Sequence, residues 1–271
     1  MTVTAPAVIP RPRSPHFRFE DVPRHWFNGS PLATHLSNGV HLLFPAGERF
    51  FVRSVRHYMS VIEKDPLLRE QVRGFFGQEG RHAKAHEDQF EILEAQGYRL
   101  KAFLRVYEAF AFGFLERIMP PAACLAATVA AEHYTAIMAE NAFKLGLLDT
   151  AHPVMRDLLL WHAAEEIEHK SVAYDVLKRV NPSYALRMAG MAVTTVMLAS
   201  FWAAAALVLL AQDGTPPAEV LRELKAFQQN HPVQERVFAR GIREYVRRSF
   251  HPSDNDNAGL AASYLASARM A

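Results

Sequence analysis

Two stretches of this chain of 271 residues repeat one short pattern, a glutamate followed three positions later by a histidine. Glu79 and His82 form the first pair, and Glu166 and His169 form the second. Helix-forming residues surround both pairs, and residues three apart share one face of an α-helix. Each pair therefore directs a carboxylate and an imidazole to the same place. This geometry suits a metal ion, and it requires both stretches to be helical.

A second level of repetition places another apolar helix before each pair. Glu48 lies in the helix that precedes the first pair, and Glu132 in the helix that precedes the second. This repeat predicts a four-helix bundle with one long crossover and a dinuclear carboxylate centre, the ferritin-like arrangement. The predicted metal ligands are Glu48, Glu79, His82, Glu132, Glu166 and His169.

Prolines and glycines divide the chain into helical segments. Helical spacing of apolar residues predicts five helices, at residues 45–62, 66–96, 100–119, 121–146 and 153–180. Strand-like alternation of useful length is absent, so the predicted fold is all-α: a ferritin-like four-helix bundle, a long apolar helix and C-terminal helices. We expect three regions: an extended N-terminal arm at 1–38, mobile over its first 23 residues, the di-metal bundle at 39–182, and an apolar helix with a C-terminal helical extension at 183–271.

The chain contains 13 histidines, and two more of them lie on the predicted ligand faces. His86 lies one turn after the first pair, and His162 lies one turn before the second. Two interpretations are open: imidazoles that support the ligands by hydrogen bonds, or additional ligands of a histidine-rich centre or of a third metal. His25, His35 and His41 have no partner pattern, so we expect surface or capping roles for them.

The single cysteine, Cys124, excludes an internal disulfide framework and cysteine-ligated clusters. Any metal must then use histidine and carboxylate ligands. Carboxylates with one imidazole per ion favour iron, or manganese, over zinc. The formal net charge of +2 and the lack of a phosphate-binding loop give no reason to expect nucleic acid as a partner.

Residues 188–212 carry no formal charge and are long enough to cross a bilayer. Two interpretations are open for this segment: contact with a membrane, or a buried helix or subunit interface, the latter in a homodimer. Basic residues on both sides give no clear orientation. We expect a cytoplasmic protein, with association at the inner membrane face as the membrane alternative.

Four motifs carry a family resemblance. They are FPAGERFF at 44–51, GQEGRHAKAH at 77–86, EHYTA at 132–136 and WHAAEEIEHKSVAYD at 161–175. With these motifs, residues 42–180 resemble a bacterial family of predicted metal-dependent hydrolases. The family label implies that a hydroxide bridging two metals attacks an ester or phosphoester.

Similarity to ferritin-like di-iron proteins implies different chemistry. It implies two transition-metal ions, iron or manganese, that activate dioxygen as a co-substrate and oxidise a small apolar or lipid-like substrate. We take this oxidoreductase as the main hypothesis and the metal-dependent hydrolase as its alternative. A non-catalytic metal store or membrane-associated scaffold is the second alternative.

Overall fold

Several helices begin where a capping side chain meets a proline or a helix former. Asp65 accepts hydrogen bonds from the backbone N–H groups of Leu67 and Leu68, both at 3.1 Å, and caps α4 (Pro66–Ala95). Ser183 caps α10 (Tyr184–Asp213) in the same way. These local signals explain why the long helices begin close to the residues that the sequence predicts.

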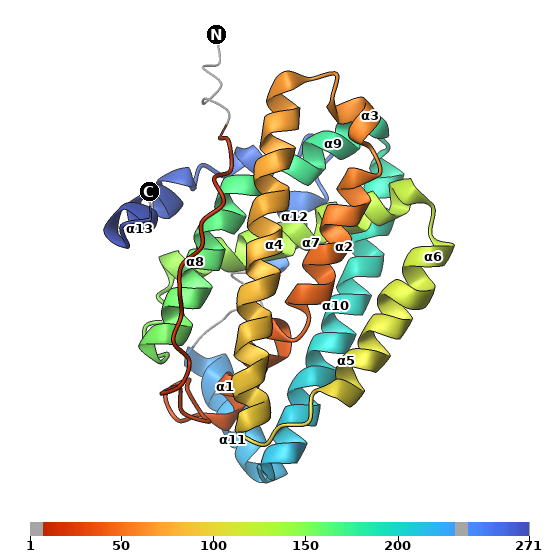
Figure 1. Cartoon of the computed structure of the whole chain (residues 1–271). Helices are drawn as coiled ribbons and strands as arrows, with labels where there is room; N and C mark the ends of the chain where they lie inside the picture. Colours follow the sequence, from red (N-terminus) through yellow and green to blue (C-terminus); the bar gives the residue numbers. More distant parts are fainter. Residues whose placement is uncertain (1–7, 231–237, 271) are drawn as a thin grey trace.

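The computed structural model describes residues 8–230 and 238–270, and it contains no β-strand within them beyond one isolated bridge. The chain is all-α, as predicted (Figure 1). Besides α4 and α10, its helices are α1 (Pro31–His41), α2 (Phe44–Arg56), α3 (Met59–Ile62), α5 (Lys101–Glu108), the π-helix η1 (Ala109–Leu115), α6 (Glu116–Ile118), α7 (Pro121–Lys144), α8 (Pro153–His169), α9 (Val172–Val180), α11 (Pro217–Asn230), α12 (Arg240–Tyr245), the short 3₁₀ helix η3 (Pro252–Asp254) and α13 (Ala258–Ser267).

Four helices enclose the centre of the molecule. α2 packs against α4 and α7, and α8 packs against the same two helices, so the four close a ring. The long helix α10 lies along α7 and α1 on the outside of this ring (Figure 1). Fully buried side chains such as Val55, Phe75 and Leu125 fill one part of the interior. The four ring helices are the ones that carry the predicted ligands.

Three of the predicted helices differ in the structure: two are interrupted, and one is widened in its middle. The helix expected at 45–62 is divided into α2 and α3 at His57 and Tyr58, two residues of moderate helix propensity. The helix expected at 153–180 is divided into α8 and α9 directly after His169, where the Lys170 ammonium donates to Asn257 Oδ1 and to a backbone carbonyl of the C-terminal segment. The helix expected at 100–119 forms, but η1 widens its middle.

The N-terminal arm is packed against the helices along its described part. Residues 8–30 run beside α4 (Figure 1). Two glycines of this helix leave room for the chain. At Gly74, for example, a Cβ would lie only 2.1 Å from the carbonyl oxygen of Pro10. The Arg13 guanidinium donates to both carboxylate oxygens of Glu168, at 2.8 and 2.9 Å. The arm is also shorter than expected, because Ser30 caps a helix, α1, that takes in its last eight residues. Residues 1–7 lie outside the described part of the chain.

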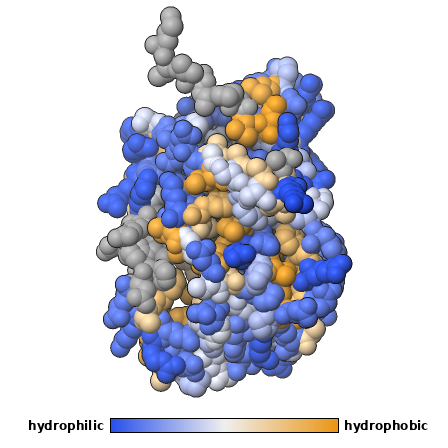
Figure 2. All heavy atoms as spheres, turned by 90° about the vertical axis from the view of Figure 1, so that its left-hand side faces the viewer, coloured by the Kyte–Doolittle hydropathy of each residue, from blue (hydrophilic) through white to orange (hydrophobic). Residues whose placement is uncertain are grey.

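Two helices, α7 and α10, are long and apolar enough to cross a membrane by length and composition. In α7, 78% of the apolar window is buried inside the protein, which is typical of a core helix; in α10 only 22% is buried. The side of the molecule that carries α8 and α13 is largely hydrophilic, with separate hydrophobic areas (Figure 2). Membrane contact through 188–212 and the cytoplasmic location both stay predictions.

We predict that Gly74→Ala displaces the N-terminal arm, because the new methyl group would overlap the backbone of Pro10. The expected cost is about 1–3 kcal/mol of unfolding free energy, together with faster proteolysis within the arm. Gly80→Ala on the same helix is the matched control: no atom lies within 4 Å of its Cβ position, and alanine there favours the helix by up to about 1 kcal/mol. Equal stability of the two variants would contradict this packing.

Candidate metal centre

All eight residues singled out by the sequence lie on the ring helices and point into the bundle. Each is at most 3% exposed. α2 supplies Glu48, α4 supplies Glu79, His82 and His86, α7 supplies Glu132, and α8 supplies His162, Glu166 and His169. Residues from four separate segments of the chain thus meet in one buried region.

The first group surrounds one imidazole nitrogen. His169 Nε2 lies 3.1 Å from Glu79 Oε1 and 3.3 Å from Glu166 Oε2. Glu132 Oε2, from the fourth helix, lies 3.3 Å from the same nitrogen. Glu79, Glu166 and His169 offer ligand atoms that all lie within 4.8 Å of one another, which is close enough for one metal ion to contact all of them.

The second group joins Glu48, His82 and His162, again with ligand atoms within 4.8 Å of one another. The rings of His82 and His162 stack at 4.1 Å, and His162 Nε2 lies 3.7 Å from Glu48 Oε1. Glu166 connects the two groups, because its Oε1 lies 2.8 Å from His162 Nε2 while its Oε2 faces His169. Two adjacent sites with a shared carboxylate are the arrangement expected of a dinuclear centre.

The two additional histidines occupy different places. His162 belongs to the second group, whereas His86 lies behind it, with Nε2 2.7 Å from His162 Nδ1. The other nitrogen of His86 lies 2.7 Å from His41 Nδ1. This geometry favours His162 as an additional ligand and His86 as its support; both roles stay predictions.

Eight buried atoms of the predicted ligands make no hydrogen bond of good geometry, although some lie in ion-pair contact with one another: both carboxylate oxygens of Glu48, Glu79 and Glu132, together with His82 Nδ1 and His169 Nε2. An unsatisfied buried polar atom costs about 1–3 kcal/mol, so such a concentration indicates that the atoms serve another partner. Carboxylate oxygens and imidazole nitrogens are ligands of divalent transition metals. The residues therefore fit a pair of divalent metal ions.

Burial shapes the protonation of the cluster. Removal from water raises the pKa of Glu48 and of Glu79 well above the ordinary range, and the neighbouring carboxylates raise it further. Burial likewise raises the pKa of Glu132 to about 7 and holds the pKa of His82 well below its ordinary value. Divalent cations would offset the same repulsion by replacing these protons.

His169 and Glu166 behave in the opposite way because they face each other. Burial disfavours the charged form of each. Glu166 and Glu132 nevertheless raise the pKa of His169 well above its ordinary value, while His169 and His162 lower the pKa of Glu166. Without a cation, this ion pair is the main charge compensation at the centre.

Residues missed by the sequence reasoning contact the predicted ligands from outside. Gln78 Oε1 lies 2.9 Å from His169 Nδ1, Glu165 Oε2 lies 3.0 Å from His82 Nε2, and Thr135 donates its hydroxyl to Glu166 Oε2. Their only signal in the sequence is their position. Gln78 lies next to the predicted ligand Glu79, and Thr135 lies one turn after the predicted ligand Glu132. Glu165, directly before Glu166, supports a predicted ligand and belongs to neither group.

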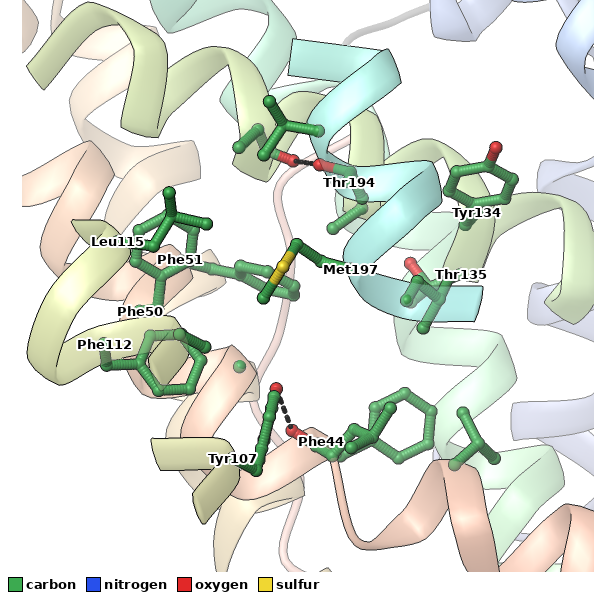
Figure 3. A pocket seen from close by; sticks show the side chains of 18 of the residues that line it. Phe44, Phe50, Phe51, Tyr107, Phe112, Leu115, Tyr134, Thr135, Thr194 and Met197 are labelled. Atoms are coloured by element: carbon green, nitrogen blue, oxygen red, sulfur yellow. Dashed lines mark hydrogen bonds between the residues drawn. The ribbon is translucent and has the colours of Figure 1, made fainter. Parts of the chain in front are cut away.

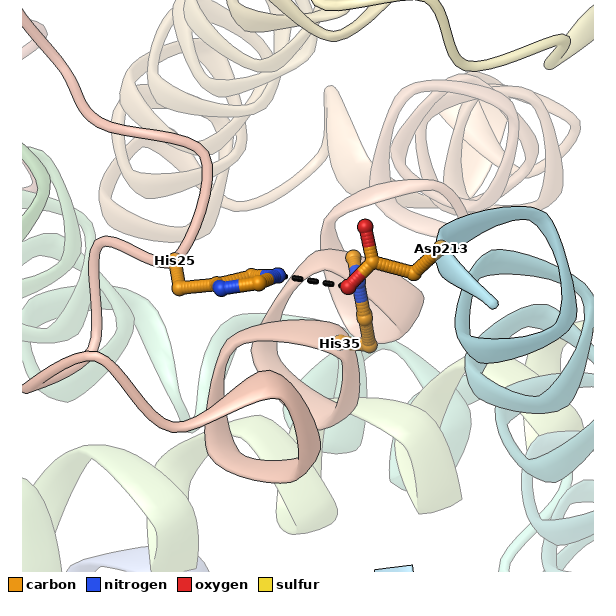
Figure 4. Close-up of side chains that lie close together, drawn as sticks. All are labelled: His25, His35 and Asp213. Carbon is orange, nitrogen blue, oxygen red and sulfur yellow. Dashed lines mark hydrogen bonds and ion pairs between the residues drawn. The ribbon is translucent and has the colours of Figure 1, made fainter. Parts of the chain in front are cut away.

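The expectation of surface or capping roles is wrong for His35 and His41, which are fully buried. His35 on α1 lies near His25 and Asp213, where α10 ends (Figure 4). Asp213 also accepts hydrogen bonds from Arg24 and Tyr98. Burial opposes ionisation of Asp213, but the hydrogen bonds from its partners, His25 first, hold its pKa far below the ordinary range. This third group ties the arm to α10.

We predict that Asp213→Asn destabilises the protein by about 1–3 kcal/mol at neutral pH, because charged hydrogen bonds are lost. A depressed carboxyl pKa stabilises the fold above the unfolded-state pKa of about 3.9 and loses that contribution as the pH falls below it. The loss of unfolding free energy caused by Asp213→Asn should therefore become smaller in acid. Chemical denaturation over a pH series measures it, with Asp157→Asn, an exposed acid on α8, as the control; a deficit that is independent of pH would contradict the account.

The fold and these His/Glu groups define an all-α protein built to bind metal. The family model described as "Predicted metal-dependent hydrolase" matches residues 11–256, and the chain belongs to this family. The resemblance inferred from the four motifs is thereby confirmed. Neither the curated proteins nor the solved structures include a match to this chain.

The family corrects the main functional hypothesis. An oxidoreductase that activates dioxygen was expected, but the family description names a hydrolase, which was the stated alternative. The physical reason for the error is that glutamates and histidines can hold a metal pair for redox chemistry or for hydrolysis. The ligand pattern in the sequence does not distinguish the two.

We predict that divalent metal stabilises the protein through these ligands. Metal at 100 times its Kd should add about 2.7 kcal/mol. The raised carboxyl pKa values should weaken metal-free stability as the pH rises from about 4.3 towards about 7, while metal binding tightens. Thermal unfolding with and without Mn²⁺, Fe²⁺ or Zn²⁺ should thus show a larger metal-induced shift at neutral pH.

Two variants on α4 make this experiment specific. Glu79→Gln should abolish most of the metal-induced shift, whereas Glu91→Gln, which changes an exposed acid on the same helix, should keep it. A shift of equal size in both variants would show that the metal binds elsewhere.

Proposed function

We propose that this chain hydrolyses an ester or phosphoester at a dinuclear metal centre formed by Glu48, Glu79, His82, Glu132, Glu166 and His169, with His162 as an additional ligand. One observation carries the proposal: eight buried carboxylate and imidazole atoms that make no hydrogen bond of good geometry converge from four helices. The family description, which names metal-dependent hydrolysis, supports the reaction class.

Bound divalent ions would supply Lewis-acid activation of water and of the substrate oxygen. Glu166 suits a bridging position because its two oxygens face different groups. We propose iron or manganese as the bound metal, because both match the carboxylate-rich donor set.

The surrounding side chains set the orientation of each ligand. The Gln78 carbonyl oxygen accepts the His169 Nδ1–H, which leaves Nε2 to face the carboxylates. The amide group of Gln78 donates to Glu168 at 2.7 Å, and Arg13 from the N-terminal arm holds Glu168 in turn. The arm thus takes part in positioning His169.

A similar arrangement orients the second imidazole. Glu165 accepts the His82 Nε2–H, so the unprotonated Nδ1 faces the centre. The carboxylate of Glu165 also accepts hydrogen bonds from the backbone N–H and the guanidinium of Arg13. Thr135 donates to Glu166 and limits the rotation of that carboxylate.

The test uses the purified full chain loaded with a single metal and a panel of p-nitrophenyl carboxylic and phosphoric esters. We predict hydrolysis that chelation removes and metal restores. Glu79→Gln should reduce it to the uncatalysed rate, and Gln78→Leu should reduce it roughly 10- to 100-fold, as is typical for groups that orient ligands.

The matched control for this test is Glu91→Gln, which should retain the wild-type rate. A protein that binds two metal ions but hydrolyses neither ester class would contradict the proposed function.

A further inference from the structure

An apolar cavity of about 130 Å³ lies beside the metal centre, between α2, η1, α7 and α10 (Figure 3). Its walls are mostly aromatic and aliphatic, with Phe44, Phe51, Phe112 and Met197 among them. Apolar cavities of about 150 Å³ in other proteins stay dry and admit a molecule the size of benzene. The cavity is therefore large enough for a short hydrocarbon group.

The polar groups in its wall are already occupied. The Tyr107 hydroxyl donates to the Leu43 carbonyl at 3.3 Å, and the Thr194 hydroxyl donates to the Ala127 carbonyl at 2.9 Å (Figure 3). Tyr134 shares a hydrogen bond of 2.7 Å with a threonine of α10. A polar ligand or a water cluster would find few free partners there, so the chemistry of the wall selects a hydrocarbon.

The cavity and the metal centre share two wall residues. Thr135 lines the cavity and donates to Glu166. Phe44 also lines it, and its ring lies 4.7 Å from the ring of His162 and 4.8 Å from that of His86. A chain held in the cavity would therefore place its attached polar group next to the proposed ligands.

Small residues keep the space open. Gly47 lies in the first turns of α2 directly before Glu48, although glycine costs a helix up to about 1 kcal/mol. A Cβ there would lie 3.8 Å or more from every neighbouring atom, so a steric clash does not explain why this position is glycine. Ala111 lines the cavity from η1, and π-helical segments often occur at functional sites.

The outer surface near the cavity is apolar as well. Three lining residues, Leu115, Met119 and Met197, are only partly buried, which places one edge of the cavity near the surface. Next to this edge, Phe114 on η1 is 53% exposed and Val196 on α10 is 65% exposed. A hydrophobic substrate would contact this surface before it enters.

We propose that the cavity binds the hydrocarbon chain of the substrate, and that the substrate is a carboxylic ester with a short to medium acyl chain. The inference rests on the proposed hydrolysis. In the reaction a water oxygen forms the new bond to the acyl carbon, the ester C–O bond breaks, and the alcohol leaves with the proton, so no oxidant or reductant is needed.

Binding is tested without turnover, with 1-hexanol titrated into the metal-loaded protein by calorimetry. Hexanol should bind with a negative heat-capacity change, the mark of apolar burial. Ala111→Leu should weaken binding roughly tenfold, since the added isopropyl group occupies the space of the ligand. Ala109→Leu adds the same group to an exposed position on the same helix and should leave binding unchanged. Absence of hexanol binding, or equal effects of the two variants, would overturn the inference.

A kinetic comparison separates the two proposals. Wild-type protein should prefer a hexanoyl over an acetyl p-nitrophenyl ester in kcat/KM, Ala111→Leu should lower that ratio roughly tenfold, and Ala109→Leu should preserve it. An alkyl phosphoester hydrolysed in preference to the acyl ester would overturn the assigned substrate class. Hydrolysis without chain-length preference or hexanol binding would refute the cavity and leave the proposed function standing. Hexanol binding that Ala111→Leu weakens, without hydrolysis of any ester, would support binding in the cavity and refute the proposed function.

Discussion

The burial of four glutamates at the centre of one bundle is the constraint on which the rest of the structure depends. Removing a carboxylate from water costs several kcal/mol unless a positive charge and hydrogen bonds compensate it. Glu48, Glu79 and Glu132 accept no hydrogen bond of good geometry, and their contacts at the centre are to the imidazoles of His162 and His169. Protonation of His169 compensates only part of this charge, so divalent cations account best for the whole arrangement.

The centre also differs sharply in polarity from the apolar cavity beside it. Thr135 and Phe44 each face both regions, so a carboxylate cluster and a hydrocarbon-lined cavity are separated by single side chains. A substrate with a polar ester and an apolar chain matches this contrast. The N-terminal arm completes the other side of the centre, because Arg13 forms ion pairs with Glu165 and Glu168 behind the predicted ligands.

Local patterns were the most predictable part of this molecule. Glu79 with His82, and Glu166 with His169, were recognisable because their geometry depends only on helix periodicity, and the motifs around them identified the family. The all-α fold followed from the same periodicity. That these residues bind metal remains a prediction, although the structure brings all of them together.

Long-range relations were not predictable in the same way. Arg13 lies far along the chain from Glu165, and His41 from His86, so neither contact has a local signal. The chemistry was also underdetermined: a Glu/His donor set serves both oxygen activation and hydrolysis, and the family description corrected that choice. The break after His169 coincides with the contact of Lys170 with the C-terminal segment, which periodicity does not encode.

The central claim is that two metal ions occupy the bundle. The most direct test is anomalous scattering from crystals of the protein purified with its native metal and measured at the metal absorption edges. We predict two peaks, one beside Glu79, Glu132 and His169, and one beside Glu48, His82 and His162, with Glu166 between them. Native crystals without metal at the centre, or with metal only beside His25 and Asp213, would contradict the account.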